Sequence, residues 1–174
     1  MPATKLSTAL AEGERRSVGR ADEAAVLVRR EPRRVEELLG CLAEGEDPAL
    51  RAHAAHALMQ VGRDAPEVLH PFADRLIHEV GADPQWELRE QFSKVAVRLE
   101  LSKRQAKAVA ELFQDYLSDR HSIVRTCALQ GLFDLSSDGR YPAASVRRML
   151  QHAEETGSKA MAARARRLLA KLAH

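Results

Sequence analysis

The residues of this chain that could do chemistry are seven histidines, two cysteines and several adjacent carboxylates. His53 and His56 stand three residues apart, a spacing at which two imidazoles on one helix could share a metal ion with a third ligand. No acidic residue or cysteine stands at a matching spacing beside them, and His70 and His78 fall in another segment. We therefore expect no metal site and no cofactor.

Nucleophilic and redox chemistry have little support in the sequence. Cys41 and Cys127 lie 86 residues apart without a CxxC pair, which argues against a zinc site or a disulfide framework. Cys127 has no base or acid partner nearby in the sequence, and adjacent carboxylates such as Glu36-Glu37 point apart on a helix. Phosphate-binding glycine loops, HExxH and GxSxG do not occur. We expect no enzymatic activity.

Other polar residues recur at offsets 3, 6 and 10 of four similar segments. On a helix these offsets share one side, so packed segments would align them in a polar stripe. A solvated face is one interpretation of this stripe, and a binding site for a protein partner is the other. The residues predicted to bind a partner are His53, His56, Gln60, Gln91, Lys94, Arg98, Gln130, Asp134, Arg164, Arg167 and Lys171.

The segments that carry the stripe repeat one phrase, which is clearest in Asp119–Leu135. Apolar or small residues follow Val124 at offsets 4, 7, 8 and 11, which is one face of an α-helix. Copies begin at Leu50, Leu88 and, more weakly, Met161, in steps of 38, 36 and 37 residues. A period near 37 residues indicates an array of helical hairpins, whereas a single globular bundle has no reason to repeat a phrase.

Short connections predict that neighbouring helices are antiparallel, in a single domain over residues 20–174. The predicted pairs cover approximately residues 33–61, 66–101, 102–135 and 143–173. Asp47-Pro48, Asp83-Pro84 and Ser102 are expected helix starts. An N-terminal capping helix is predicted from Arg20 to the residues before Pro32, and residues 1–19 are expected to form a poorly ordered tail.

The phrase Asp-Pro, aliphatic-Arg, then small residues and Leu on a second helix resembles the HEAT repeat. Residues 47–58 (DPALRAHAAHAL), 83–99 and 119–135 carry it. The resemblance implies an all-α fold, a right-handed α–α superhelix of about four hairpins, which would serve as a scaffold or adaptor. It also implies a ladder that links adjacent repeats, formed by Asp47, Asp83 and Asp119 with Arg51, Arg89 and Arg125. Arginine near a helix N-terminus opposes the helix dipole, so it independently calls for an acidic or carbonyl partner.

Charge is unevenly divided along the chain. Residues 1–87 carry 11 Lys/Arg and 16 Asp/Glu, a net charge of −5, and residues 88–174 carry 16 and nine, a net charge of +7. A mixed, solvated surface is one interpretation; a basic end that meets an acidic protein or nucleic acid is the other.

Protein binding is therefore the first functional hypothesis, and DNA binding through the basic half is the alternative. The basic residues concerned are Lys94, Arg98, Arg147, Arg148, Arg164, Arg166, Arg167 and Lys171. A HEAT-like DNA glycosylase is a third hypothesis, which the aromatic content of 4% weakens because those enzymes use aromatic residues in their groove.

The N-terminal residues MPATKLSTALAEGERR contain no apolar run long enough for a signal peptide. No stretch of the sequence approaches 18 apolar residues. We expect a cytoplasmic protein of bacterial type that does not associate with membranes.

Overall fold

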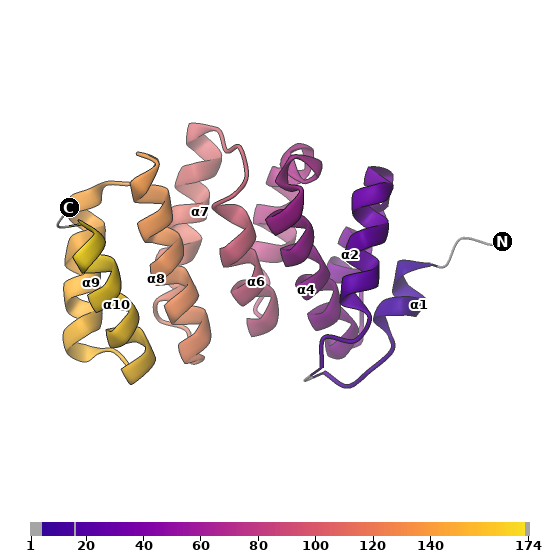
Figure 1. Ribbon diagram of the computed structural model, residues 1–174, viewed down its shortest axis with the longest axis horizontal. Coiled ribbons are helices and arrows are strands. Elements are labelled where there is room, and N and C mark those ends of the chain that lie inside the picture. The colour runs from indigo at the N-terminus through magenta and orange to yellow at the C-terminus, as the bar shows by residue number, and fades with distance from the viewer. Residues whose placement is uncertain (1–4, 16, 173–174) are drawn as a thin grey trace. The chain divides into compact units, whose positions relative to one another are not determined.

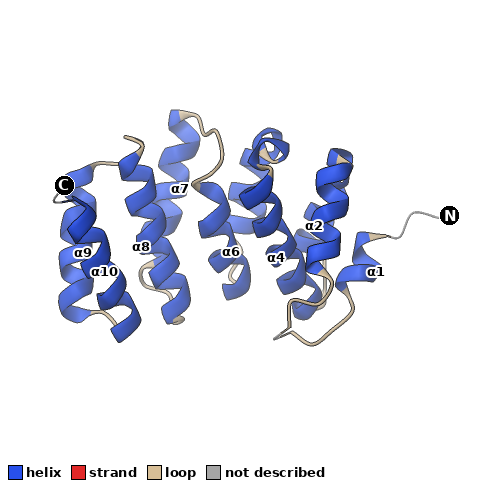
Figure 2. Ribbon diagram, viewed as in Figure 1, coloured by secondary structure: helices blue, strands red, loops and turns tan. Residues whose placement is uncertain are grey.

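The computed structural model describes residues 5–15 and 17–172, and these are all-helical, without a strand (Figures 1 and 2). The α-helices are α1 (Leu6–Leu10), α2 (Ala21–Arg30), α3 (Val35–Ala43), α4 (Pro48–Asp64), α5 (Ala73–Arg75), α6 (Trp86–Ala96), α7 (Lys103–Tyr116), α8 (Ser122–Ser137), α9 (Ala143–Thr156) and α10 (Lys159–Leu172). Four further turns are 3₁₀ or π-helical: η1 (Pro32–Arg34), η2 (Pro66–Val68), η3 (His70–Phe72) and η4 (Leu76–Gly81). None of these described helices combines the length and apolarity needed to cross a lipid bilayer.

The chain divides into two compact units, residues 1–100 and 101–174. Residues 1–4 and 16 of the predicted tail, and residues 173–174 of the predicted last pair, lie outside the described residues. Each unit has its own core and is described by itself below.

The first unit consists of two helical layers. In one layer α2, α4 and α6 lie side by side, and in the other α3 packs against η4 (Figure 1). The core between them contains Leu38, Leu58, Leu76, Leu88 and Phe92, none of which is accessible to solvent. Burying one such side chain contributes about 1.5–3 kcal/mol, so this apolar face fixes which side of α4 and α6 remains at the surface.

The second unit is built from α7, α8, α9 and α10. Helix α8 packs against α7, α9 and α10, and α9 packs against α10. Phe113 and Tyr116 of α7 are buried, with ring centroids 6.1 Å apart. Gly131 of α8 makes room for Phe113, because a Cβ there would lie 2.4 Å from Phe113 Cε2.

Helices begin close to the predicted signals. Asp47 caps α4 by accepting from Ala49 N at 2.9 Å, with Pro48 as the first helical residue. Ser102 caps α7 in a capping box, in which Ser102 Oγ accepts from Gln105 N and Gln105 Oε1 accepts from Ser102 N. Helix α6 begins at Trp86 and ends at Ala96, so it stops before residue 101, the end of the predicted pair.

The predicted pair over residues 66–101 implies a first helix over residues 66–80, and this expectation is wrong for a single α-helix. Its apolar residues are buried as expected, but the backbone passes through η2, η3, the three residues of α5 and the π-helical η4. Pro71 lies in the middle of this segment. In an α-helix the proline ring would clash with the carbonyl group of the residue four positions earlier, and proline has no N–H group to donate. A regular α-helix therefore does not continue through Pro71.

The segment before α2 is ordered where the structure describes it, in contrast to the poorly ordered tail expected there. Leu6 and Leu10 of α1 are fully buried and Ala9 is 2% exposed. Helix α1 packs against α2, α3 and α4, and Leu6 N donates to a carboxylate oxygen of Glu37. We call residues 5–20, without the undescribed residue 16, the N-terminal segment.

Candidate functional site

The helical offsets predicted that the whole polar stripe of the first unit lies at the surface, but its first residue does not. His53, its first member, is 1% exposed, because the N-terminal segment lies over it. His53 therefore contacts the protein's own chain instead of facing a partner. Sequence periodicity could not indicate this, since the covering residues lie about 40 positions upstream.

Both ring nitrogens of His53 face main-chain carbonyl groups of the N-terminal segment. Nδ1 lies 2.8 Å from Leu10 O and Nε2 lies 3.0 Å from Glu14 O. A carbonyl oxygen only accepts hydrogen bonds, so a ring nitrogen of His53 that carries a proton donates it to the carbonyl it faces. Gly19 has a φ of +52°, and a Cβ there would lie 2.9 Å from His53 Nδ1. Glycine thus permits the close approach of the segment.

A second contact joins the N-terminal segment to α6. Arg15 donates from Nε to Glu87 Oε1 at 2.6 Å and from Nη2 to Glu87 Oε2 at 3.0 Å. The Glu87 side chain is 10% exposed. Burial favours its neutral form, but the hydrogen bonds from Arg15 and from its own backbone outweigh burial and lower the pKa of Glu87. Neither residue falls on the repeated offsets, so the helical period gives no signal for this contact.

The other stripe residues of the first unit lie at or near the surface. Burial lowers the pKa of the half-buried His56. Gln60 donates to a carboxylate oxygen of Asp22 on α2, and Arg98 is exposed.

Two stripe residues on α6 contact each other. Lys94 Nζ donates to Glu90 Oε1 at 2.7 Å and to Gln91 Oε1 at 3.2 Å. Lys94 is half-buried, whereas Gln91 is 8% exposed. Gln91 therefore holds the Lys94 side chain in place, and it exposes little surface to a partner protein.

In the second unit three stripe residues form a hydrogen-bonded chain. Arg164 Nη1 donates to Gln130 Oε1 at 2.7 Å, and Gln130 Nε2 donates to Asp134 Oδ1 at 2.8 Å. This chain connects α8 to α10 and fixes the orientation of the Gln130 amide. Arg167 and Lys171 follow on α10, and both are exposed.

The turn aspartates share one role. Asp47, Asp83 and Asp119 each accept from the main-chain N–H two residues later, at 2.9, 2.8 and 2.8 Å. These bonds satisfy donors that helix N-termini leave free.

The repeated arginines each donate to a main-chain carbonyl that precedes their own helix, which for Arg51 lies in the last turn of α3 and for Arg89 and Arg125 lies in the preceding turn. Arg51 Nε donates to Leu42 O at 2.7 Å, Arg89 Nε to Asp83 O at 2.8 Å, and Arg125 Nη1 to Asp119 O at 2.5 Å. Arg51 also forms an ion pair with Asp83, which links the first two repeats.

Residues of the second unit carry 13 Lys/Arg and seven Asp/Glu, a net charge of +6. Among the described residues, the basic side chains of α9 and α10 form no ion pair with a carboxylate, and most are exposed. The exposed ones are Arg147, Arg148, Lys159, Arg166, Arg167 and Lys171.

Residues with metal or nucleophile chemistry do not gather in the part of the chain that the structure describes. Histidine, cysteine and acidic side chains form no group of three or more there that could hold a metal ion. Cys41 is buried, and burial together with the nearby charge of Glu37 raises its pKa to about 11. A thiol with such a pKa is a poor nucleophile at neutral pH.

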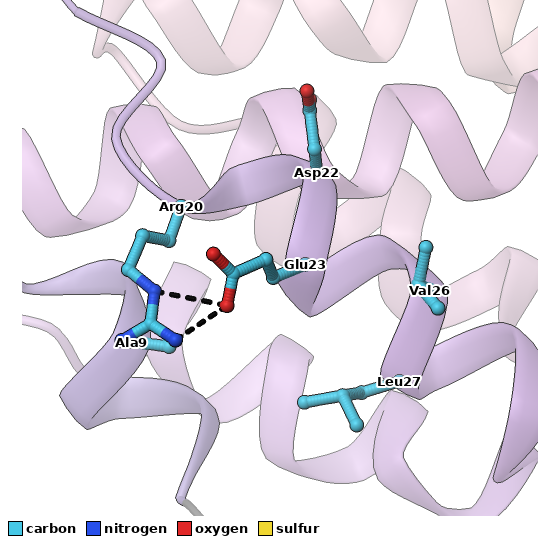
Figure 3. A pocket seen from close by; sticks show the side chains of 6 residues that line it. All are labelled: Ala9, Arg20, Asp22, Glu23, Val26 and Leu27. Carbon is cyan, nitrogen blue, oxygen red and sulfur yellow. Dashed lines mark hydrogen bonds and ion pairs between the residues drawn. The ribbon is translucent and has the colours of Figure 1, made fainter.

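Several hollows lie on the described surface. One, of about 430 Å³, is lined by Ala9 of α1 and by Val26 and Leu27 of α2 (Figure 3). Arg20 and Glu23, at its rim, are hydrogen-bonded to each other, so this hollow is chiefly apolar.

The second hollow, of about 570 Å³, lies in the second unit. Its lining includes Leu129, Met149, Met161 and Arg125. The Arg125 guanidinium already donates hydrogen bonds to Asp119 O and Arg120 O, so it is not dedicated to binding a ligand in this hollow.

Comparisons of the chain with protein-family models, with curated proteins and with solved structures gave no match.

Proposed function

We propose that the protein is a non-enzymatic scaffold module that binds another protein through the exposed polar side chains of α4, α6, α8 and α10. The observation that carries this proposal is that the surface of α4 and α6 already holds a polypeptide, the N-terminal segment. It does so by pairing main-chain carbonyls with His53 and a guanidinium with Glu87. The same kinds of contact serve in peptide recognition between proteins.

The accessible residues define the surface available to such a partner. In the first unit they are His56, Gln60, Lys94 and Arg98, while His53 and Gln91 act behind them. The corresponding residues of the second unit are Gln130, Asp134, Arg164, Arg167 and Lys171.

The proposal extends to architecture: the hairpins form a HEAT-like, right-handed solenoid. The period near 37 residues supports it, as does the Arg51–Asp83 ion pair between successive hairpins of the first unit. Stacked repeats expose an extended surface to which several repeats contribute, and that surface suits a protein partner.

The test is an affinity purification with the intact protein as bait, followed by variants. Changing Lys94 and Arg98 together to alanine should release the bound protein, because both side chains lie on the proposed surface. The matched control changes Lys103 and Lys107, which are exposed on α7 outside the stripe. Helicity should be equal in both variants. Loss of the partner from the control alone, or from neither variant, would place the binding surface elsewhere.

Nucleic-acid binding is the second candidate, and the exposed basic residues of α9 and α10 favour it. Phosphates attract unpaired lysine and arginine, and the affinity then falls steeply with salt concentration. Titration with duplex and single-stranded DNA at rising salt tests this candidate. Charge reversal at Arg166 and Arg167 should abolish such binding. No binding at low salt would exclude it.

A further inference from the structure

We propose that the N-terminal segment is an internal ligand of the first unit, and that a partner segment of the same chemistry displaces it. We call the surface of α2, α3, α4 and α6 that the N-terminal segment contacts the seat. The partner segment carries two leucines one helical turn apart and an arginine five residues after the second, as Leu6, Leu10 and Arg15 do. This inference goes beyond the proposed function, because the N-terminal segment covers Glu37, His53 and Glu87 and not the exposed stripe residues.

The apolar part of the seat is made for a short helical turn. Leu6 and Leu10 are fully buried, although α1 has only five residues. A helix of that length is unstable alone in water, so its packing against α2, α3 and α4 holds it. The seat thus supplies most of the order of its occupant, as a helix-binding groove does.

The polar part of the seat recognises main-chain groups as well as one side chain. His53 faces two carbonyl oxygens, and Glu37 accepts from the main-chain N–H of Leu6. These contacts are open to any sequence that adopts the same path. Selectivity therefore comes from the leucine pockets and from the guanidinium of Arg15 on Glu87.

Charge around the Arg15 position further defines the occupant. The carboxylates of Glu87 and Asp47 both raise the pKa of Arg15, the first chiefly by its hydrogen bond. Two acidic groups at the exit of an apolar seat favour a basic peptide and repel phosphate. The occupant is therefore a protein segment and not a nucleic acid.

The N-terminal segment is suited to leave its seat without unfolding the unit. The segment turns at Gly13, after α1, and at Gly19, before α2, which have φ values of +104° and +52°. The Arg15 side chain is 46% exposed, so water reaches its ion pair. Segments whose polar contacts are accessible to water open locally at a lower free energy than core helices.

The test uses a fluorescent peptide with the sequence of residues 5–20 and the full-length chain. In the unchanged protein the tethered segment competes at a high effective concentration. In the variant Leu6→Ala/Leu10→Ala the tethered anchors are gone, so we expect the peptide to bind at least tenfold more tightly than it binds the unchanged chain. Peptide with Leu10→Ala should lose this gain.

A charge exchange tests the arginine contact. The peptide with Arg15→Glu should bind poorly to the Leu6→Ala/Leu10→Ala chain and recover on the same chain with Glu87→Arg added. Equal binding of all peptides, or none by a variant whose helicity is normal, would overturn the proposal. A concentration-dependent dimer of the unchanged protein would also overturn it, because a second copy would then be the occupant.

Hydrogen exchange on the unchanged protein covers the case in which the leucine variant does not fold. Amides of residues 6–10 should exchange at least tenfold faster than those in the middle of α4. Equal protection would mean that the segment is a permanent cap and would overturn the proposal. The proposed function is judged separately: a partner lost on changing Lys94 and Arg98, with no peptide binding, would refute only the internal ligand.

Discussion

At the residue scale, replacing Gly131 or Gly40 by alanine should change the free energy of unfolding in opposite directions. Gly131→Ala should lower the free energy of unfolding, because the added Cβ meets the buried ring of Phe113 at 2.4 Å. Overpacking of this kind costs about 1–3 kcal/mol, more than alanine gains in helix propensity. Urea denaturation followed by circular dichroism measures the change.

Gly40→Ala is the control for that prediction. Gly40 lies in α3, and a Cβ there meets nothing within 4 Å. Alanine should therefore stabilise the protein by about 0.5–1 kcal/mol. If Gly131→Ala were as stable as Gly40→Ala, the close packing of α8 on Phe113 would be refuted.

Glu87 should make docking of the N-terminal segment sensitive to acid. Its pKa lies below the ordinary value of 4.5, so its contribution is complete above pH 4.5 and is lost as the pH falls through the lowered pKa. Backbone NMR relaxation of residues 6–15 should report greater mobility at pH 3 than at pH 6. Glu87→Gln should show that mobility already at pH 6.

The exposed Glu67, also in the first unit, provides the matched control. Glu67→Gln should retain the rigid segment at pH 6 and its loosening in acid. If Glu87→Gln left the segment as rigid at pH 6 as in the unchanged protein, the Arg15 contact would not hold the segment.

The two cysteines should differ in reactivity. With a pKa of about 11, only roughly one Cys41 in a thousand is a thiolate at pH 8. Cys127 is half-buried, so it should react with iodoacetamide at least tenfold faster than Cys41 in the native protein. In guanidinium chloride the two rates should converge, and equal rates in the native protein would contradict the burial of Cys41. Mass spectrometry of labelled peptides gives both rates.

At the scale of the elements, the Arg51–Asp83 ion pair should couple the first two hairpins. Each side chain is 16% exposed, so solvent screens the pair little. A double-mutant cycle with Arg51→Ala and Asp83→Ala should give a coupling energy of about 1–3 kcal/mol, as for hydrogen bonds to charged groups. The cycle subtracts the separate bonds from Arg51 to Leu42 O and from Gln85 N to Asp83.

The pair Lys107–Glu111 is the control for this cycle. Its atoms are 3.8 Å apart and its side chains are 80% and 63% exposed. Coupling there should stay below about 0.5 kcal/mol. Equal coupling in both cycles would mean that Arg51 and Asp83 do not link the hairpins.

The helices with local signals were predictable from the sequence, and those shaped by distant residues were not. Ser102 and its capping box mark the start of α7, and Asp47-Pro48 marks that of α4. The sequence also contains Pro71, but whether this proline breaks or only kinks a helix over residues 66–80 depends on the tertiary packing around it. Periodicity finds which side of a helix is buried: the predicted inward residues of α4 and α8 are buried, whereas Leu169 and Leu172 of α10 are only half-buried.

The candidate site was predictable only in part, for a physical reason. Offsets on a helix assign a side chain to a face, but they do not say what covers that face. His53 has the offset of a surface residue and is buried by a segment 43 positions away. Leu6, Ala9 and Leu10 span a single helical turn, which is too short to give a periodic signal. The contact between Arg15 and Glu87 has no local sequence signal.

At the scale of the whole molecule, the proposed solenoid predicts an elongated particle in solution. A globular chain of this length has a radius of gyration of about 16 Å. Small-angle X-ray scattering of the monomer should give a clearly larger value, because stacked hairpins extend in one direction. A value near 16 Å with a compact scattering profile would contradict the proposed architecture. It would leave the two compact units themselves unaffected.

The N-terminal segment also has a consequence for how the protein is made. Arg15 and Glu87 are 72 positions apart, and His53 lies 43 positions from Leu10. Translation reaches α6 only some 70 residues after the segment. Until then Leu6 and Leu10 have no complete seat, and contacts of long sequence separation form slowly. The N-terminal segment is thus synthesised well before the helix that completes its packing.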